Sequence, residues 1–308
     1  YKTISFFKLK IKSKLTHMKK TGIIPFIAIT GYILYSLGFS ILGNGFEFLT
    51  LQQIQTVPAD SLIFGRDKSP YNNDSVEFIA RVVAPPRVSP ANGDNRTMLR
   101  GTTSWTCYAQ DTANGLFGGI VIRQGTQSVQ TGLDLLDTGA LIKVRGVIQE
   151  FGSTLPGINY SNTLTQLALD IADGYTISIL GSSPKRPTPK QVTIPEFANG
   201  DYPNGGTINY VQGEKYEGMY VEFRNVTIGP GVGTRQPWSI IDEFGNKLYF
   251  RDFSNFFSTS PSGDTLRPWT HPTIGTFVNY IRGVIISANN EGVFGTQLPY
   301  AIVPIYPN

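Results

Sequence analysis

The chain has 308 residues, of which only 16% are charged, and it is rich in Gly (33), Pro (20), Tyr (15) and Phe (19). Its formal net charge of +4 comes from residues 1–20, which hold seven lysines and no acidic residue; the rest has 19 basic and 22 acidic residues, a net charge of −3. A slightly acidic body has no overall field that would attract a phosphate backbone. The single cysteine, Cys107, excludes an internal disulfide and a cysteine metal cluster.

Residues 1–43 are predicted to be upstream sequence followed by an export signal. Met18 is followed by Lys19 and Lys20, and residues 21–46 carry no charge. A positive segment before an apolar one is typical of a signal peptide, and small residues at positions 38–43 are the expected cleavage points. An uncleaved membrane anchor is the alternative, because the apolar run is long enough to span a bilayer. We expect translation to start at Met18 and the protein to be exported, to the cell surface, the medium or the periplasm.

Two units of one plan follow this leader. The phrase Val144-Arg-Gly-Val-Ile148 returns as Ile281-Arg-Gly-Val-Ile285, and in both copies a Val-Glu-Phe phrase lies 60 to 70 residues earlier. Internal repetition predicts two copies of one domain, at residues 76–180 and 213–308. Residues 44–75 are predicted to be a polar approach segment. Residues 181–212, which begin with a run rich in proline, are predicted to be a stiff, exposed connector.

Strand signals dominate both units, because β-branched and aromatic residues alternate with polar ones between turn residues. In the second unit Val221 and Phe223 share a face, which Val226 and Ile228 resume after a one-residue slip at Asn225. Gly146 and Gly283 lie inside strong strands, where glycine usually marks a sharp bend or a close backbone approach. Helix signal is thin, and residues 164–171 are the only apolar stretch that fits a short helix. The expected fold is all-β: two OB-like five-stranded Greek-key barrels in tandem, preceded by an N-terminal hydrophobic leader.

Several phrases resemble the OB-like domains of exported bacterial nucleases and surface proteins of the Bacteroidota. They are Tyr108-Ala-Gln-Asp111, Gly119-Ile-Val-Ile122 and Ile142-Lys-Val-Arg-Gly-Val-Ile148 in the first unit, and residues 214–227 in the second. The resemblance covers roughly residues 75–308. It implies export, often by the type IX secretion route, and contact with the secretion machinery. It also implies a parent protein that continues beyond Asn308, because such proteins end in a sorting domain.

Groups for catalysis are scarce beyond the leader. His271 is the only histidine there, which removes the ligands and bases of histidine-rich metal sites and nucleases. Asp111 and Asp242 occupy matching positions after the second strand of each unit. We expect them to close turns through backbone amides, with calcium coordination as the alternative. No catalytic residue and no cofactor is predicted.

Binding is the better-supported role, because OB barrels present ligands on strands two and three. Alternation from the apolar Cys107 and Ala109 predicts that the side chains between them face solvent, and the same reasoning applies to Leu248 and Phe250. Two long loops add arginines at residues 85–101 and aromatic residues at 253–272. The predicted ligand-binding residues are Tyr108, Gln110, Arg123, Lys247, Tyr249, Arg251, Phe256, Phe257 and Trp269.

The sequence therefore predicts a non-enzymatic binding or adhesion module of a larger exported protein. The expected ligand is an oligosaccharide or a single-stranded nucleic acid, because aromatic and basic side chains on one face suit stacking on sugars or bases. A nucleic-acid-binding accessory of a secreted nuclease and a structural spacer are the two alternatives. Contact with a membrane is expected only through the leader.

Overall fold

The computed structural model describes residues 45–64, 66–89, 94–97, 104–126, 130–152, 163–169, 174–183, 185–202, 204–232, 236–251, 272–287 and 300–305. The predicted leader lies outside these ranges. The chain divides at Asn44, and residues 45–308 form one compact unit to which both barrels belong. Within the described residues, no helix has the length and apolar character needed to cross a membrane.

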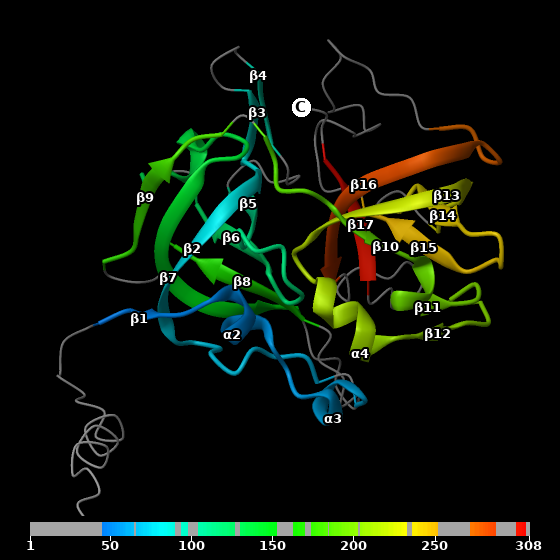
Figure 1. Ribbon diagram of the computed structural model, residues 1–308, viewed down its shortest axis with the longest axis horizontal. Coiled ribbons are helices and arrows are strands. Elements are labelled where there is room, and N and C mark those ends of the chain that lie inside the picture. Colours follow the sequence, from blue (N-terminus) through cyan, green and yellow to red (C-terminus); the bar gives the residue numbers. More distant parts are fainter. Residues whose placement is uncertain are drawn as a thin grey trace, which may run out of the picture. The chain divides into compact units, whose positions relative to one another are not determined.

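Five strands close the first barrel, with β7 pairing back to β2 (Figure 1). The order around it is β2-β5-β6-β8-β7; β6 and β8 are parallel and the other neighbours are antiparallel. This is the topology of the predicted five-stranded Greek-key barrel. The strands are β2 (Ser75–Ala84), β5 (Trp105–Gln110), β6 (Gly119–Gln124), β7 (Leu141–Phe151) and β8 (Leu164–Ala168).

The second barrel repeats this topology strand for strand. Its order is β13-β14-β15-β17-β16, again closed between the first and fourth strands and again with one parallel pair, β15 and β17. The predicted fold class is therefore confirmed for the barrels. The strands are β13 (Tyr220–Pro230), β14 (Trp238–Ile241), β15 (Lys247–Phe250), β16 (Phe277–Ser287) and β17 (Tyr300–Pro304).

Shorter elements surround the barrels. Ahead of and around the first are β1 (Glu47–Phe48), α2 (Leu51–Gln55), α3 (Ala59–Leu62), β3 (Arg87–Ser89), β4 (Asp94–Thr97), η2 (Leu133–Leu135) and β9 (Thr176–Gly181). Before the second come β10 (Lys190–Val192), η3 (Ile194–Glu196), β11 (Ala198–Asn199), β12 (Thr207–Ile208), α4 (Tyr210–Gly213) and η4 (Glu214–Tyr216). Residues 164–168 are β8 in place of the short helix that the sequence suggested.

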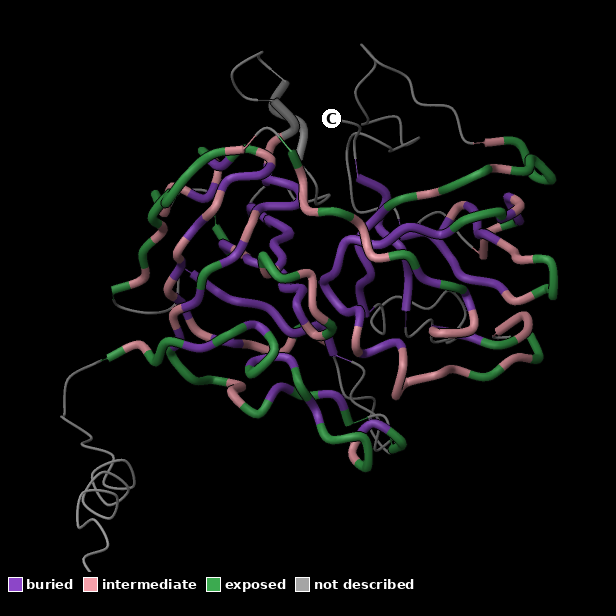
Figure 2. The backbone as a smooth tube through the Cα atoms, viewed as in Figure 1, coloured by how far each residue is buried: buried purple, intermediate pink, exposed green. Residues whose placement is uncertain are grey.

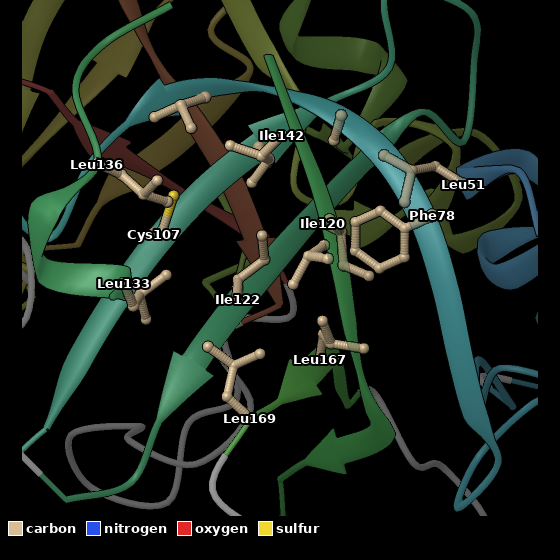
Figure 3. Close-up of a cluster of buried hydrophobic side chains, with 14 of the residues drawn as sticks. Leu51, Phe78, Cys107, Ile120, Ile122, Leu133, Leu136, Ile142, Leu167 and Leu169 are labelled. Atoms are coloured by element: carbon tan, nitrogen blue, oxygen red, sulfur yellow. The ribbon is translucent and has the colours of Figure 1, made fainter. Parts of the chain in front are cut away.

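The alternating strands fill the first barrel with apolar side chains, as Figure 3 shows. In β2 the side chains of Val76, Phe78, Ala80 and Val82 are fully buried. Glu77 and Ile79, which alternate with them, are at least partly accessible to solvent. Leu51 of α2 packs into the same core. Burial of an aliphatic or aromatic side chain contributes about 1.5–3 kcal/mol, so this alternation is the main source of the barrel's stability.

The repeated phrases occupy equivalent places in the two barrels. Glu77 lies opposite Arg145 and forms an ion pair with it, and Glu222 lies opposite Arg282, with Oε2 at 2.7 Å from the guanidinium Nε. Each arginine precedes a glycine at the position where the strand changes its pairing partner. In the first barrel β7 changes from β2 to β8, and in the second β16 changes from β13 to β17. The repeat is thus a cross-strand ion pair placed beside a bend.

The slip predicted at Asn225 is confirmed. Phe223 and Val226 are both buried, while the two residues between them, Arg224 and Asn225, are exposed. Asn225 takes a left-handed φ of 52°, which asparagine tolerates better than most residues. The left-handed residue turns the strand so that both halves of β13 face the core.

The two barrels share a third apolar cluster. Val83, Ala84, Tyr108, Val121 and Leu164 of the first barrel pack with residues of the second, all at most 8% exposed. The partners from the second barrel are Tyr220, Val284, Ile286, Ala301, Val303 and Ile305. Apolar burial of this kind favours a fixed contact over two independently moving domains.

Two predicted boundaries are corrected by the packing. The approach segment was predicted for residues 44–75, and its described residues are part of the first barrel's fold, because Leu49, Leu51 and Ile54 are buried in its core. The connector prediction is wrong for residues 190–212: β10 pairs with β13, and Ile194 and Phe197 are buried in the second core. The proline-rich start of this segment led to the prediction that all of it is exposed, although apolar residues follow the prolines.

Candidate functional site

The face of the first barrel that the sequence assigns to a ligand is buried between the barrels. Tyr108 is 1% exposed and belongs to the shared cluster, and Gln110 is fully buried. The Tyr220 amide donates to Gln110 Oε1 at 2.9 Å, so a side chain predicted to touch a ligand touches the second barrel. Burial also raises the pKa of the Tyr108 hydroxyl. The prediction that these side chains face solvent is wrong.

The matching face of the second barrel is also covered. Lys247, Tyr249 and Arg251 are between 2% and 9% exposed. The Lys247 amide donates to Gly200 O at 3.1 Å, and Lys247 Nζ lies 2.7 Å from Asp201 Oδ1. The segment that was predicted to be an exposed connector therefore lies over β15, and its Asp201 is close to both Lys247 and Tyr249. Arg251 lies close enough to Tyr108 of the first barrel to influence it electrostatically. Much of the chain through these strands is buried (Figure 2).

This burial predicts a large effect for one mutation. Tyr249→Ala should lower the free energy of unfolding by about 3 kcal/mol, because a large aromatic side chain is removed from a packed site. Burial and the Asp201 carboxylate raise the Tyr249 pKa to about 12, as expected for a phenol in this setting. Urea denaturation of the variant gives the measurement. A change below about 0.5 kcal/mol, as at a solvated position, would contradict the packing.

The two matching aspartates close turns, as predicted. Asp242 Oδ1 accepts hydrogen bonds from the Phe244 and Asn246 amides at 3.0 and 2.9 Å, and Asp111 Oδ1 accepts one from Gly115 at 3.2 Å. Burial is the largest influence on Asp111 and raises its pKa. In the described part of the chain, no three His, Cys, Asp or Glu side chains lie where they could hold a metal ion. Phe256, Phe257, Trp269 and His271 lie outside the described residues.

Among the predicted ligand-binding residues that the structure describes, Arg123 lines a cavity. The cavity has a volume of about 350 Å³ and lies beside the ends of β6, β7 and β8. We call it the first-barrel cavity. Its lining comprises four amide side chains, three charged side chains and three other residues: Asn72, Asn73, Gln149, Gln166, Lys68, Arg123, Glu150, Phe151, Gly152 and Thr163.

Arginine and phenylalanine form one wall of the first-barrel cavity. The Arg123 guanidinium lies 5.4 Å from the centre of the Phe151 ring, whose residue is 43% exposed. Glu150, the acidic residue of the lining, accepts hydrogen bonds from the Ser69 amide and the Thr163 hydroxyl, both at 2.8 Å. Because Glu150 is held by these donors, Arg123 and the amides are the groups best placed for a ligand.

Most of this wall was missed from the sequence. Asn72 and Asn73 belong to a turn before β2, and the Asn73 amide donates to Ile148 O at 2.7 Å, which places that turn against β7. Gln149 and Gln166 are register partners on β7 and β8. Since these residues are far apart in the chain, only the pairing of the strands brings their amides together. No local signal in the sequence marks them.

A second hollow lies on the second barrel where β13 changes neighbour from β10 to β14. Its volume is about 460 Å³, and its apolar lining includes Val192, Ile194 and Phe223. Phe244 and Phe277 also line it and are 80% and 59% exposed. We call it the second-barrel groove. Its polar lining comprises Gln191, Thr193, Arg224, Asn225, Asp242 and Glu243, so it offers apolar and polar contacts but lacks the four gathered amides of the first-barrel cavity.

Comparison with known proteins adds nothing to the fold and the site described above. No family model and no curated protein matches the chain. Among solved structures it is similar to a protein assigned as an aspartyl-tRNA synthetase from Leishmania major Friedlin, at 8% identity and a TM-score of 0.24. That match covers 51% of this chain and 26% of the other, and a likeness this low carries no argument.

Proposed function

We propose that this chain is a non-enzymatic binding module of a larger exported protein and that it takes an oligosaccharide in the first-barrel cavity. The observation that supports the proposal is the set of four amides gathered beside Arg123 and Phe151. An amide side chain both donates and accepts hydrogen bonds, and so does a sugar hydroxyl. An exposed ring beside them provides a surface for the apolar face of a sugar.

A nucleic-acid ligand is less well supported. Lys68 and Arg123 are the basic residues of the cavity, and Glu150 lies beside them. Single-strand binders combine a basic groove along the backbone with several stacking rings. The predicted stacking face around Tyr108 and Tyr249 is buried, so it supports neither a stacked base nor a stacked sugar, and the first-barrel cavity has one exposed ring, Phe151.

The test is a glycan array followed by calorimetric titration of the best ligand into the full chain. Arg123→Ala combined with Gln149→Ala should weaken binding at least tenfold, because each lost hydrogen bond contributes roughly 0.5–1.5 kcal/mol and more when charged. Arg224→Ala, which removes an arginine from the second-barrel groove, is the matched control and should bind as the wild type does.

Three outcomes would reject this assignment. Equal losses in the Arg123 variant and the Arg224 control would remove the first-barrel cavity as the site. Binding of single-stranded DNA that falls steeply with salt, together with no glycan signal, would favour the nucleic-acid alternative. Absence of any binding to both ligand classes would favour the structural spacer.

A further inference from the structure

A group of carboxyl side chains lies inside the contact between the two barrels. Glu214 and Glu217, at η4, are 2% and 1% exposed, and Asp67, which follows α3, is 1% exposed. Together with Glu150 of β7 they are close enough to influence one another electrostatically. The group therefore combines acids from the first barrel's fold with acids from the second.

Hydrogen bonds fix both glutamates, and those of Glu217 cross the contact. The Thr165 amide of β8 donates to Glu217 Oε1 at 2.9 Å, and the Ser287 hydroxyl of β16 bonds to Glu217 Oε2. Tyr300 Oη of β17 donates to Glu214 Oε2 at 3.1 Å. Glu217 thus joins a strand of one barrel to a strand of the other, so its charge state bears directly on the contact.

The charged groups around this cluster are mostly acidic. The Thr163 amide donates to Asp67 at 2.7 Å, and Glu150 is held as described above. Of the basic residues nearby, Lys68 and Arg123 line the first-barrel cavity with Glu150, and Lys215 Nζ donates to Gln212 Oε1 at 2.6 Å. Within the described residues no lysine or arginine forms an ion pair with Glu150, Glu214 or Glu217.

Two ionised glutamates in this position would be unfavourable. A buried charge without a cationic partner loses its hydration, and neighbouring like charges repel it. A neutral acid fits the same geometry, because one oxygen accepts from the Thr165 amide and the other, which accepts from the Ser287 hydroxyl, could also donate to it, since a hydroxyl both donates and accepts. Burial accordingly raises the pKa of Glu214 and of Glu217 well above the ordinary value, and the other carboxyls raise both further.

We propose that Glu214 and Glu217 make the barrel contact a proton-controlled one, closed while both are neutral acids and loosened when they ionise. Because the folded-state pKa values are higher than those of the unfolded chain, the stabilisation is complete below the ordinary glutamate range. It is lost as pH rises through the raised values. The contact therefore weakens toward alkaline pH, opposite to the trend for an ion-paired carboxylate.

The first measurement is thermal unfolding of the full chain from pH 5 to pH 9. Each unit by which the folded pKa exceeds the unfolded one corresponds to roughly 3–5 °C in a domain of this size, so Tm should fall by about 5 °C or more. Glu214→Gln with Glu217→Gln should flatten this alkaline decrease, because a glutamine is neutral throughout. A slope unchanged by the double variant would overturn the proposal.

Glu222→Gln is the matched control. Glu222 is 4% exposed but forms ion pairs with Arg224 and Arg282, which lower its pKa against the opposing effect of burial. Its contribution is present above the ordinary glutamate range and lost as pH falls, so this variant should keep the alkaline decrease of the wild type. A flattened slope in the control would show that the pH effect has another origin.

A second set of measurements uses only the wild-type chain, so it does not depend on whether a variant folds. Infrared spectra of the wild-type chain should contain the carbonyl band of neutral carboxylic acids at neutral pH, and this band should disappear as pH rises. Hydrogen exchange of the Thr165 amide, corrected for its intrinsic pH dependence, should speed up over the same range, while β2–β7 amides remain protected. Absence of the band at neutral pH, or uniform exchange behaviour, would also overturn the proposal.

Discussion

Replacing Gly119 with alanine should disrupt the contact between the barrels and lower the free energy of unfolding by about 3 kcal/mol. Gly119 begins β6, and a Cβ there would overlap the backbone of Gly218 and Met219 of the second barrel. Gly218 itself has a φ of 70°, and a Cβ on it would lie 2.6 Å from the Ile120 nitrogen. Two glycines therefore face each other where the barrels meet, and neither backbone has room for a side chain.

The surroundings of Gly119 make relief by a small shift costly. Phe117 N donates to Lys215 O at 2.8 Å across the barrels, and Gln55 Nε2 donates to Gly119 O at 2.7 Å. Urea denaturation followed by intrinsic fluorescence gives the measurement. Gly181→Ala is the control, because a Cβ on Gly181 meets open space. Equal denaturation midpoints for the two variants would contradict the close approach.

Gly146→Val and Gly283→Val should each lower the free energy of unfolding by about 1–3 kcal/mol. The loss should be near ~3 kcal/mol if the neighbouring strand cannot move away from the new side chain. A Cβ on Gly146 would lie 2.6 Å from Ala168 O, and one on Gly283 would lie 2.5 Å from Val303 O. Both oxygens belong to the fifth strand of their barrel, so the glycines allow that strand to cross closely.

The two sites have no neighbour in common, so the double variant should lose the sum of the two single losses to within about 0.5 kcal/mol. Chemical denaturation of the two single variants and the double variant measures this sum. Gly181→Val is the matched control and should leave the midpoint nearly unchanged. Wild-type stability in either single variant would show that its strand is not bent at the glycine.

The architecture of each barrel could be predicted from local pattern. Alternation in β2 and β13, the slip at Asn225 and the glycines at 146 and 283 are each written in a few neighbouring residues. The recurrence of Glu77–Arg145 as Glu222–Arg282 showed that one plan is used twice. These features depend on strand geometry, in which successive side chains point to opposite faces of the sheet, so the sequence alone was enough to predict them.

The surroundings of the barrels could not be predicted in this way. Alternation divided β5 and β15 into two faces, but it could not tell which face would be covered by another part of the chain. Tyr108 packs against the second barrel, and Tyr249 lies close to Asp201 of the segment that precedes the second barrel. Tyrosine, lysine and arginine have apolar stems or rings with polar ends, so their identity is compatible with either outcome.

By itself, the sequence determined two five-stranded barrels and the places where their strands bend, because each follows from the chemistry of residues close together in the chain. Only the tertiary structure decided which surfaces remain accessible, which amides gather beside Arg123, and which carboxyls meet around Glu217. Those juxtapositions join residues separated by tens of positions, and they depend on how whole elements pack. The predicted ligand face became an internal contact for the same reason.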